Sequence, residues 1–391
     1  MGSTVNADKN GNALVVRLGS RLTSENAKTV QAEILELADR EPHDLLELDL
    51  TETEYVSSAG LRMFLVLHKR ERLVLTGVSS VVYDVLEITG LNKMMEIRRT
   101  VRKVSLENAR CIGSGFFSRV YRLDAETIVK VFVRDSAEED IRQELELSKY
   151  ALLMGLPTAI SFDLVEADGK KGIICEMMNS GTLQEAMAEH PERLDAYLDK
   201  YTRLLRELHE ATDTELRLPD ARQHLLGTLE KLRGMFGEEE FFTLRALMET
   251  VPESDRFIHG DCHIKNIMLH NDEPLLIDLD TLSRGDPVIE LGYLYFTYII
   301  FDEIWPGNNL EFLGTDRAAD IYCGMLRRYF AGCDETAFSE NLQRLHIIGC
   351  VRMLEYLTQF RGEEREIILR MREELLRCAA SCTTLRLTGK P

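Results

Sequence analysis

The 391-residue sequence predicts two structural units, an α/β layer domain followed by a larger unit of mixed α and β structure. Strand-like and helix-like segments alternate over about the first hundred residues, which is typical of an α/β layer domain. Residues 1–105 hold 14 basic and 15 acidic residues, a net charge of −1. The remainder holds 33 and 51, a net charge of −18, which indicates a second unit with a different role.

In the first unit, apolar runs with the period of a strand alternate with apolar positions at helical spacing. Serine and threonine residues precede the helical segments, where their side chains would cap the free backbone N–H groups. The expected strands are 13–18, 44–50, 72–76 and 94–97, and the expected helices begin after Thr23 or Ser24, at about Ser58, and after Ser79 or Ser80.

Ser57 and Ser58 are chemically distinctive because they stand where an expected strand gives way to a helix. One interpretation is a helix cap. The second is a phosphorylation site at Ser58, where a phosphate would add charge at a helix N-terminus. Both interpretations fit the same residues.

The first unit resembles the STAS domain, the fold of bacterial anti-sigma factor antagonists. The matching segments are Leu48–Thr51, Tyr55–Leu61 and Leu86–Leu91, and the resemblance spans residues 8–100. It implies a protein partner for this unit and places the family's phosphorylatable serine on Ser58. Ser57 stands where many members have Asp.

In the second unit, a glycine-containing hairpin over Ile112–Tyr121 is followed by a strand with a single lysine, Lys130. Glycines let backbone N–H groups approach a phosphate closely, and a lysine on the next strand contacts phosphates in kinases. The hairpin residues expected at the nucleotide are Gly113, Ser114, Gly115 and Ser118.

A lysine that binds phosphates needs a carboxylate to orient it, and kinases place that carboxylate on the following helix. Here an acidic helix is expected after Ser136, and Glu144 is preferred over its rival Glu146. The strand Lys171–Met178 then predicts an adenine-binding hinge with Glu176 and Met178. A buried strand and loop is the alternative interpretation of the hinge segment.

The most specific pattern is the segment Phe257–Leu269 followed by Pro274–Asp280, which contains HGDxxxxN and then IDxD. Phosphoryl transfer needs an acid beside the attacking hydroxyl and hard oxygen ligands for Mg²⁺. Asp261 would orient or deprotonate the hydroxyl, and Asn266 and Asp278 would hold magnesium.

On these motifs the second unit resembles the aminoglycoside phosphotransferase/choline kinase-like family over residues 107–390. The resemblance implies a protein-kinase-like α+β fold, with a five-stranded N-lobe, a mainly helical C-lobe and ATP between them. His259 and His263 would be structural. The sequence departs from the family at Ser118, Cys262, Lys265 and Glu290, and the implied domains are 1–103 (STAS-like), 104–178 (N-lobe) and 179–391 (C-lobe).

Aromatic and acidic residues crowd the segment from Tyr293 to Trp305, including Asp302 and Glu303. In choline and aminoglycoside kinases, such residues grip a cation. We expect most of them to be core residues and a few to line a substrate pocket.

The remaining sequence features exclude several classes of protein. A net charge of −19 disfavours binding to nucleic acid or an anionic membrane. The longest apolar run, Leu291–Phe301, is too short for a bilayer span of about 20 residues, and we expect a cytoplasmic location. The eight cysteines form no CxxC pair, which is typical of reduced thiols.

Three functions therefore compete. The preferred one is an ATP- and Mg²⁺-dependent phosphotransferase that acts on a hydroxyl of a small molecule, for which the acidic charge favours a cation, with the STAS unit for regulation or partner binding. The second is a protein kinase that phosphorylates Ser58 or a partner's serine. The third is a non-catalytic scaffold, against which the complete set of Lys130, Glu144, Asp261, Asn266 and Asp278 argues.

Overall fold

The computed structural model describes residues 6–115, 117–133, 138–178, 180–306 and 317–389. Phe116 of the glycine hairpin, Ser136 before the acidic helix and Asn179 after the hinge lie outside these ranges. The chain divides into two compact units, which we describe separately. Unit 1 comprises residues 1–109 and 163–172, and unit 2 comprises 110–162 and 173–391.

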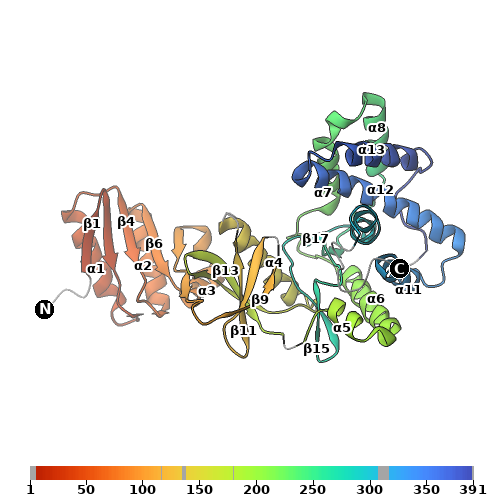
Figure 1. Cartoon of the computed structure of the whole chain (residues 1–391). Helices are drawn as coiled ribbons and strands as arrows, with labels where there is room; N and C mark the ends of the chain where they lie inside the picture. The colour runs from red at the N-terminus through yellow and green to blue at the C-terminus, as the bar shows by residue number, and fades with distance from the viewer. Residues whose placement is uncertain (1–5, 116, 134–137, 179, 307–316, 390–391) are drawn as a thin grey trace. The chain divides into compact units, whose positions relative to one another are not determined.

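Unit 1 contains a five-stranded sheet with the order β1-β2-β4-β6-β7 (Figure 1). The strands β2, β4, β6 and β7 pair in parallel, and β1 is antiparallel to β2. The strands are β1 (Asn6–Asn10), β2 (Ala13–Arg17), β4 (Leu45–Asp49), β6 (Leu73–Val78) and β7 (Glu96–Arg99), and a separate parallel pair is β3 (Arg21–Leu22) with β5 (Tyr55–Val56).

The helices of unit 1 are α1 (Ala27–Arg40), α2 (Ser58–Arg70) and α3 (Ser80–Ile88). Ser57 caps α2 by accepting from the Gly60 N–H at 3.3 Å, and Ser79 caps α3. The assigned helix α1 begins at Ala27, directly after Asn26. Thr23 has the expected capping role in the turn that leads into it, because its Oγ1 accepts from the Asn26 N–H at 3.4 Å while the Asn26 carboxamide oxygen accepts from the Thr23 N–H at 2.7 Å.

A six-stranded sheet has the order β8-β12-β13-β11-β10-β9, one strand more than the five expected. The extra strand, β8, lies in the segment expected to be a short connector, and it pairs in parallel with Val165–Ala167 of β12. The strands are β8 (Arg102–Val104), β9 (Arg110–Ser114), β10 (Ser118–Arg122), β11 (Thr127–Phe132), β12 (Ser161–Ala167) and β13 (Lys170–Glu176).

The rest of unit 2 is mainly helical. Two short antiparallel strand pairs, β14 (Phe257–Ile258) with β17 (Ser283–Arg284) and β15 (Ile267–His270) with β16 (Glu273–Leu276), hold the segment with the HGDxxxxN motif. The α-helices are α4 (Glu138–Leu153), α5 (Leu183–Glu189), α6 (Leu194–Glu210), α7 (Ala221–Lys231), α8 (Glu238–Met248), α9 (Pro287–Tyr295), α10 (Phe301–Ile304), α11 (Arg317–Tyr329), α12 (Glu335–Phe360) and α13 (Arg365–Ala379).

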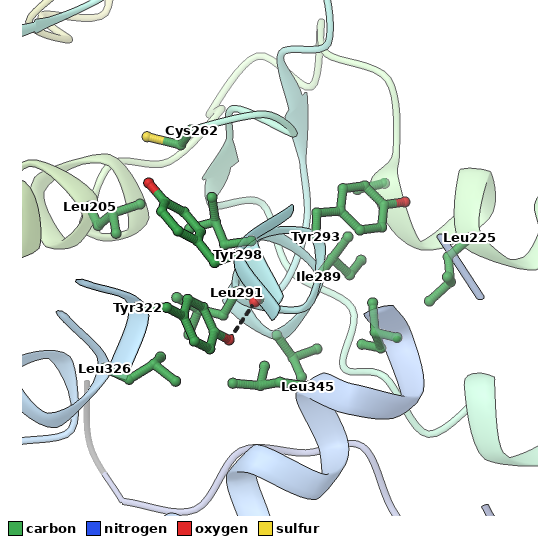
Figure 2. Close-up of a cluster of buried hydrophobic side chains, with 14 of the residues drawn as sticks. Leu205, Leu225, Cys262, Ile289, Leu291, Tyr293, Tyr298, Tyr322, Leu326 and Leu345 are labelled. Carbon is green, nitrogen blue, oxygen red and sulfur yellow. Dashed lines mark hydrogen bonds between the residues drawn. The ribbon is translucent and has the colours of Figure 1, made fainter. Parts of the chain in front are cut away.

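The core of unit 2 forms where α9 packs against α12 (Figure 2). Ile289 and Leu291 of α9 and Leu345 of α12 are fully buried there. Close approach of the two helices depends on Gly292. A Cβ atom at this position would lie 2.5 Å from Cγ2 and 2.6 Å from Cβ of Ile348.

We predict opposite effects for alanine at two helical glycines. Gly292→Ala should destabilise unit 2 by about 1–3 kcal/mol, because the added methyl group overpacks the α9–α12 contact. Gly227→Ala on α7 should stabilise it by about 1 kcal/mol, because a Cβ there meets nothing within 4 Å and alanine is the better helix former. Urea unfolding of the full chain measures both. Equal effects of the two substitutions would contradict the packing role of Gly292.

Candidate active site

The site is built around the loop between β14 and β15, which carries the HGDxxxxN motif. Gly260 turns the chain with φ of +85°, a conformation that favours glycine. Asp261, partly exposed, follows this turn. The Asn266 Nδ2 donates to the Asp261 carbonyl oxygen at 3.0 Å and to its Oδ2 at 3.2 Å, and His263 Nε2 lies 3.5 Å from the same Oδ2.

Glu290 of α9 holds the backbone of this loop, although the sequence showed it only as a departure from a family pattern. Its Oε2 accepts from the His259 N–H at 2.6 Å and from the Gly260 N–H at 3.0 Å, and its Oε1 accepts from the Cys262 N–H at 3.3 Å. The side chain has no exposed surface. Burial raises the pKa of Glu290, and the nearby His259 and the three amides partly offset this shift.

His259 has the structural position that the sequence predicted. Its Nε2 lies 3.0 Å from the Ile277 carbonyl oxygen, and its own carbonyl oxygen accepts from the Thr281 hydroxyl at 2.7 Å. These bonds join the HGDxxxxN loop to the segment that carries Asp278. Asp278 adopts a φ of +63°, an uncommon conformation for a residue other than glycine and one that often occurs at functional sites.

Lys130 of β11 contacts two carboxylates at once. Its Nζ lies 2.7 Å from Glu144 Oε1 on α4, and it is also hydrogen bonded to Asp278. The rival Glu146 is exposed on another face of α4. The structure therefore brings together three of the predicted site residues, from the sheet, from α4 and from the segment after β16.

The pKa values in this cluster reflect two carboxylates that share one ammonium group. Burial alone would lower the pKa of Lys130, but the charges of Asp278 and Glu144 raise it above its usual value. For Asp278, burial is outweighed by the charge of Lys130, and its pKa is lowered. Burial raises the pKa of Glu144 to about 7, because its share of the Lys130 charge does not compensate.

Asp280 is an acidic residue of this site that the sequence interpretation left without a role. Burial, which removes water from the carboxylate, is the largest cause that raises its pKa to about 6, and the negative charge of Asp278 is the second. Its signal was the second Asp of the IDxD pattern. A carboxyl group that titrates near neutral pH beside a kinase-like loop is a candidate functional group.

The glycine hairpin has the predicted position but not an obvious internal reason for its glycines. Gly113 and Gly115 both have ordinary φ angles, and a Cβ on either would meet its neighbours no closer than 3.5 Å. Alanine would therefore fit in the protein alone. Glycine at these positions is consistent with a ligand that approaches the backbone, as phosphates do. Ser114 ends β9, and Ser118 begins β10.

At the expected hinge, Glu176 ends β13 and closes a small ring with Ile160. The Glu176 N–H donates to the Ile160 carbonyl oxygen at 2.8 Å, and Glu176 Oε2 accepts from the Ile160 N–H at 3.3 Å. Met178 is buried. A polar pocket of about 420 Å³ lies beyond this segment, lined in part by Ser180, Gly181 and Tyr197, and it includes none of the predicted site residues.

The residues expected to hold magnesium fit that role chemically. Asn266 points its amide nitrogen at Asp261, which leaves its carbonyl oxygen as the atom to offer to a cation. Asp278 supplies a carboxylate. Among the described residues, no group of three His, Cys, Asp or Glu side chains could hold a metal. Mg²⁺ is commonly bound by only one or two protein oxygens together with phosphates and water.

The aromatic segment after Glu290 is mostly core, as expected. Tyr293, Tyr298 and Phe301 are buried. Trp305 is partly exposed, but the Arg361 guanidinium already lies 5.2 Å from its ring centroid. The chain is not a continuous α-helix here, because Phe296–Ile300 form a π-helical turn (η4).

Comparison with known proteins agrees with this geometry. The family model described as "Phosphotransferase enzyme family" matches residues 108–321, more than half of the chain. The chain belongs to this phosphotransferase family. Its kinase-like unit is a nucleotide-dependent phosphotransferase that acts on hydroxyl groups, and a STAS domain model matches residues 4–104.

Individual relatives of this phosphotransferase cover different shares of the chain. An anti-sigma-B factor antagonist of Listeria monocytogenes is 33% identical over 82 residues, which are 20% of this chain and 72% of that protein. A crystal structure of an ADP-bound aminoglycoside phosphotransferase is 18% identical, covers 74% of this chain and 96% of its own, and has a TM-score of 0.46. A choline/ethanolamine kinase family protein from Mesorhizobium loti is 12% identical, covers 70% and 91%, and has a TM-score of 0.47. At such low identities and TM-scores, the assignment rests on the family models.

For this phosphotransferase, we predict that Glu144→Gln lowers the affinity for nucleotide and the turnover by at least about tenfold, because Lys130 loses the partner that orients it. Glu146→Gln, a matched change on the same helix, should leave both within about twofold. Nucleotide titration calorimetry and a coupled assay measure the two variants. Equal losses in both would contradict the assignment of Glu144.

Proposed function

We propose that the protein transfers the γ-phosphate of ATP, with Mg²⁺, to a hydroxyl of a small molecule. The observation that carries this proposal is the placement of Asp261 within hydrogen-bonding distance of Asn266, on a loop joined through His259 to the segment of Asp278, which itself contacts Lys130. These are the parts that phosphoryl transfer requires, in one cluster.

In this proposal each residue has one task. Lys130, oriented by Glu144, binds the phosphates, while the backbone near Gly113, Ser114, Gly115 and Ser118 covers them, and Glu176 and Met178 flank the adenine. Asp261 accepts the proton of the acceptor hydroxyl as its oxygen bonds to the γ-phosphorus and the bond to the β-phosphate oxygen breaks. Asn266 and Asp278 would hold Mg²⁺, which neutralises charge on the phosphates when bound.

The class of acceptor is proposed from charge. Unit 2 carries most of the net charge of −19, so its field favours a cationic acceptor. Two of the structural neighbours are an aminoglycoside phosphotransferase and a choline/ethanolamine kinase family protein, whose named ligand classes are cationic. We place the reaction in the cytoplasm, and we assign the STAS unit to regulation or partner binding. Within the described residues, no helix has the length and apolar character needed to cross a membrane.

To test the proposal, amino alcohols, aminoglycosides and sugars are first screened by thermal shift with Mg²⁺ and a non-hydrolysable ATP analogue, because a ligand raises apparent stability. Stabilising compounds are then assayed for phosphorylated product. We predict that Asp261→Asn lowers turnover about 10²–10⁴-fold, the usual contribution of a general base. Asp255→Asn, whose carboxylate pairs with Arg284, is the matched control and should retain activity. Wild-type turnover by the Asp261 variant would overturn the proposal.

A second candidate function rests on Ser58. The structure shows that Ser57, not Ser58, is the buried cap of α2, and that Ser58 is exposed as the first residue of the helix. A phosphate there would be accessible and would lie at the positive end of the helix. The kinase-like unit would then phosphorylate Ser58, or a serine of a partner, in an anti-sigma-type pathway.

This second function predicts that Ser58 gains one phosphate when the full chain is incubated with ATP and Mg²⁺, as mass spectrometry detects. The same chain with Asp261→Asn should remain unmodified, since a contaminating kinase would label both. An unmodified Ser58, together with no labelled protein in a cell lysate, would contradict the second function.

A further inference from the structure

Two buried tyrosines contact the backbone of the catalytic loop immediately after Asp261. Tyr201 of α6 donates its hydroxyl proton to the Cys262 carbonyl oxygen at 2.7 Å. Tyr298 of the η4 turn accepts at its hydroxyl oxygen from the Ile264 N–H at 3.0 Å. Both rings are fully or almost fully buried, so water does not compete for these bonds.

The two hydroxyl groups hold different backbone groups of the same short segment. Tyr201 uses its one proton on the Cys262 carbonyl oxygen, and Tyr298 offers an oxygen lone pair to the Ile264 N–H. One attachment therefore lies just before His263 and the other just after it. We call these two residues with their bonds the tyrosine pair.

The backbone of η4 places Tyr298 where its hydroxyl reaches the loop. A π-helical turn contains an extra residue relative to an α-helix, and one residue corresponds to about 100° of rotation around the helix axis. In Figure 2, the Tyr298 hydroxyl is directed toward Cys262, whereas the Tyr322 hydroxyl, in the same buried cluster, is bonded to the Leu291 carbonyl oxygen. Single π-helical turns are frequent at functional sites.

The two bonds of the tyrosine pair lie on either side of His263, whose Nε2 lies 3.5 Å from the Asp261 carboxylate. Glu290 already holds the loop on the N-terminal side through His259, Gly260 and Cys262. Without a second attachment, the backbone after Cys262 could rotate and take His263 with it. Burial raises the pKa of both hydroxyls above the usual value of a tyrosine, so both stay protonated over the whole physiological range.

We propose that Tyr201 and Tyr298 are positioning residues for phosphoryl transfer, which act as one unit to fix the Cys262–Ile264 backbone and thereby the place of His263 beside Asp261. This inference rests on the proposed function of Asp261. A displacement of a catalytic group by about 1 Å is enough to slow an oriented reaction severely.

The test compares Tyr298→Phe, Tyr201→Phe and the double variant in the full chain, with Tyr322→Phe as the matched control. Each single change removes one buried hydroxyl. We predict that either single variant of the tyrosine pair lowers kcat about tenfold with the KM for ATP within about twofold. The double variant should lose no more than a single one, because the loss of either attachment already frees His263. Tyr322→Phe should keep the wild-type kcat while showing a similar loss of thermal stability.

Several outcomes would overturn the inference. One is a kcat for Tyr298→Phe equal to that of Tyr322→Phe, and another is a double variant whose loss is the product of the two single losses. If Asp261→Asn still abolishes turnover in those experiments, only the positioning role of the tyrosine pair is overturned and the proposed function stands. Amide hydrogen exchange decides the matter without activity or variants, because a rapidly exchanging Ile264 amide in the unaltered chain would also overturn it.

Discussion

The arrangement of the active site depends on one buried carboxylate, that of Glu290. Three backbone N–H groups of the HGDxxxxN loop, those of His259, Gly260 and Cys262, donate to it, and an unpaired buried carboxylate would be very costly. The carboxylate and the loop therefore stabilise each other. Glu290 belongs to α9, and α9 is held against α12 by the contact that Gly292 permits. The position of Asp261 thus depends on helix packing in the C-terminal half of the chain.

The two units of the chain contribute different chemistry. The phosphotransferase unit has a cluster of charged residues in which Lys130 is bonded to two carboxylates and Asp261 to the amide of Asn266. The STAS unit instead offers an exposed serine at the start of α2, beside a neutral cap. In the second proposed function, the reaction centre of one unit would act on this hydroxyl of the other.

Much of the fold could be predicted from the sequence, because apolar periodicity marks the core elements. The helix Ser58–Arg70 has the expected start and end, since a serine cap and a strand on each side define it. The polar strand β1, whose five residues are all exposed, had no such signal. It pairs with β2 through backbone hydrogen bonds, which a pattern of apolar side chains does not reveal.

The candidate site divides along the same line. Residues in a linear motif, such as Asp261, Asn266 and Asp278, could be found because their spacing is local. Glu290, Tyr201 and Tyr298 act through contacts between distant segments, and no spacing predicts which hydroxyl reaches which carbonyl. The π-helical turn that orients Tyr298 contains no glycine or proline that would mark it in the sequence.

The shared position of Lys130 has a consequence for how the nucleotide enters. Its ammonium group is already bonded to Asp278 and Glu144, so a phosphate that binds there must compete with these two carboxylates. In the proposed function, binding of the nucleotide would be an exchange of partners, in which Lys130 gives up part of one ion pair as it forms another. The affinity for nucleotide would then reflect the difference between two strong interactions, and it would be lower than for a lysine without a carboxylate partner.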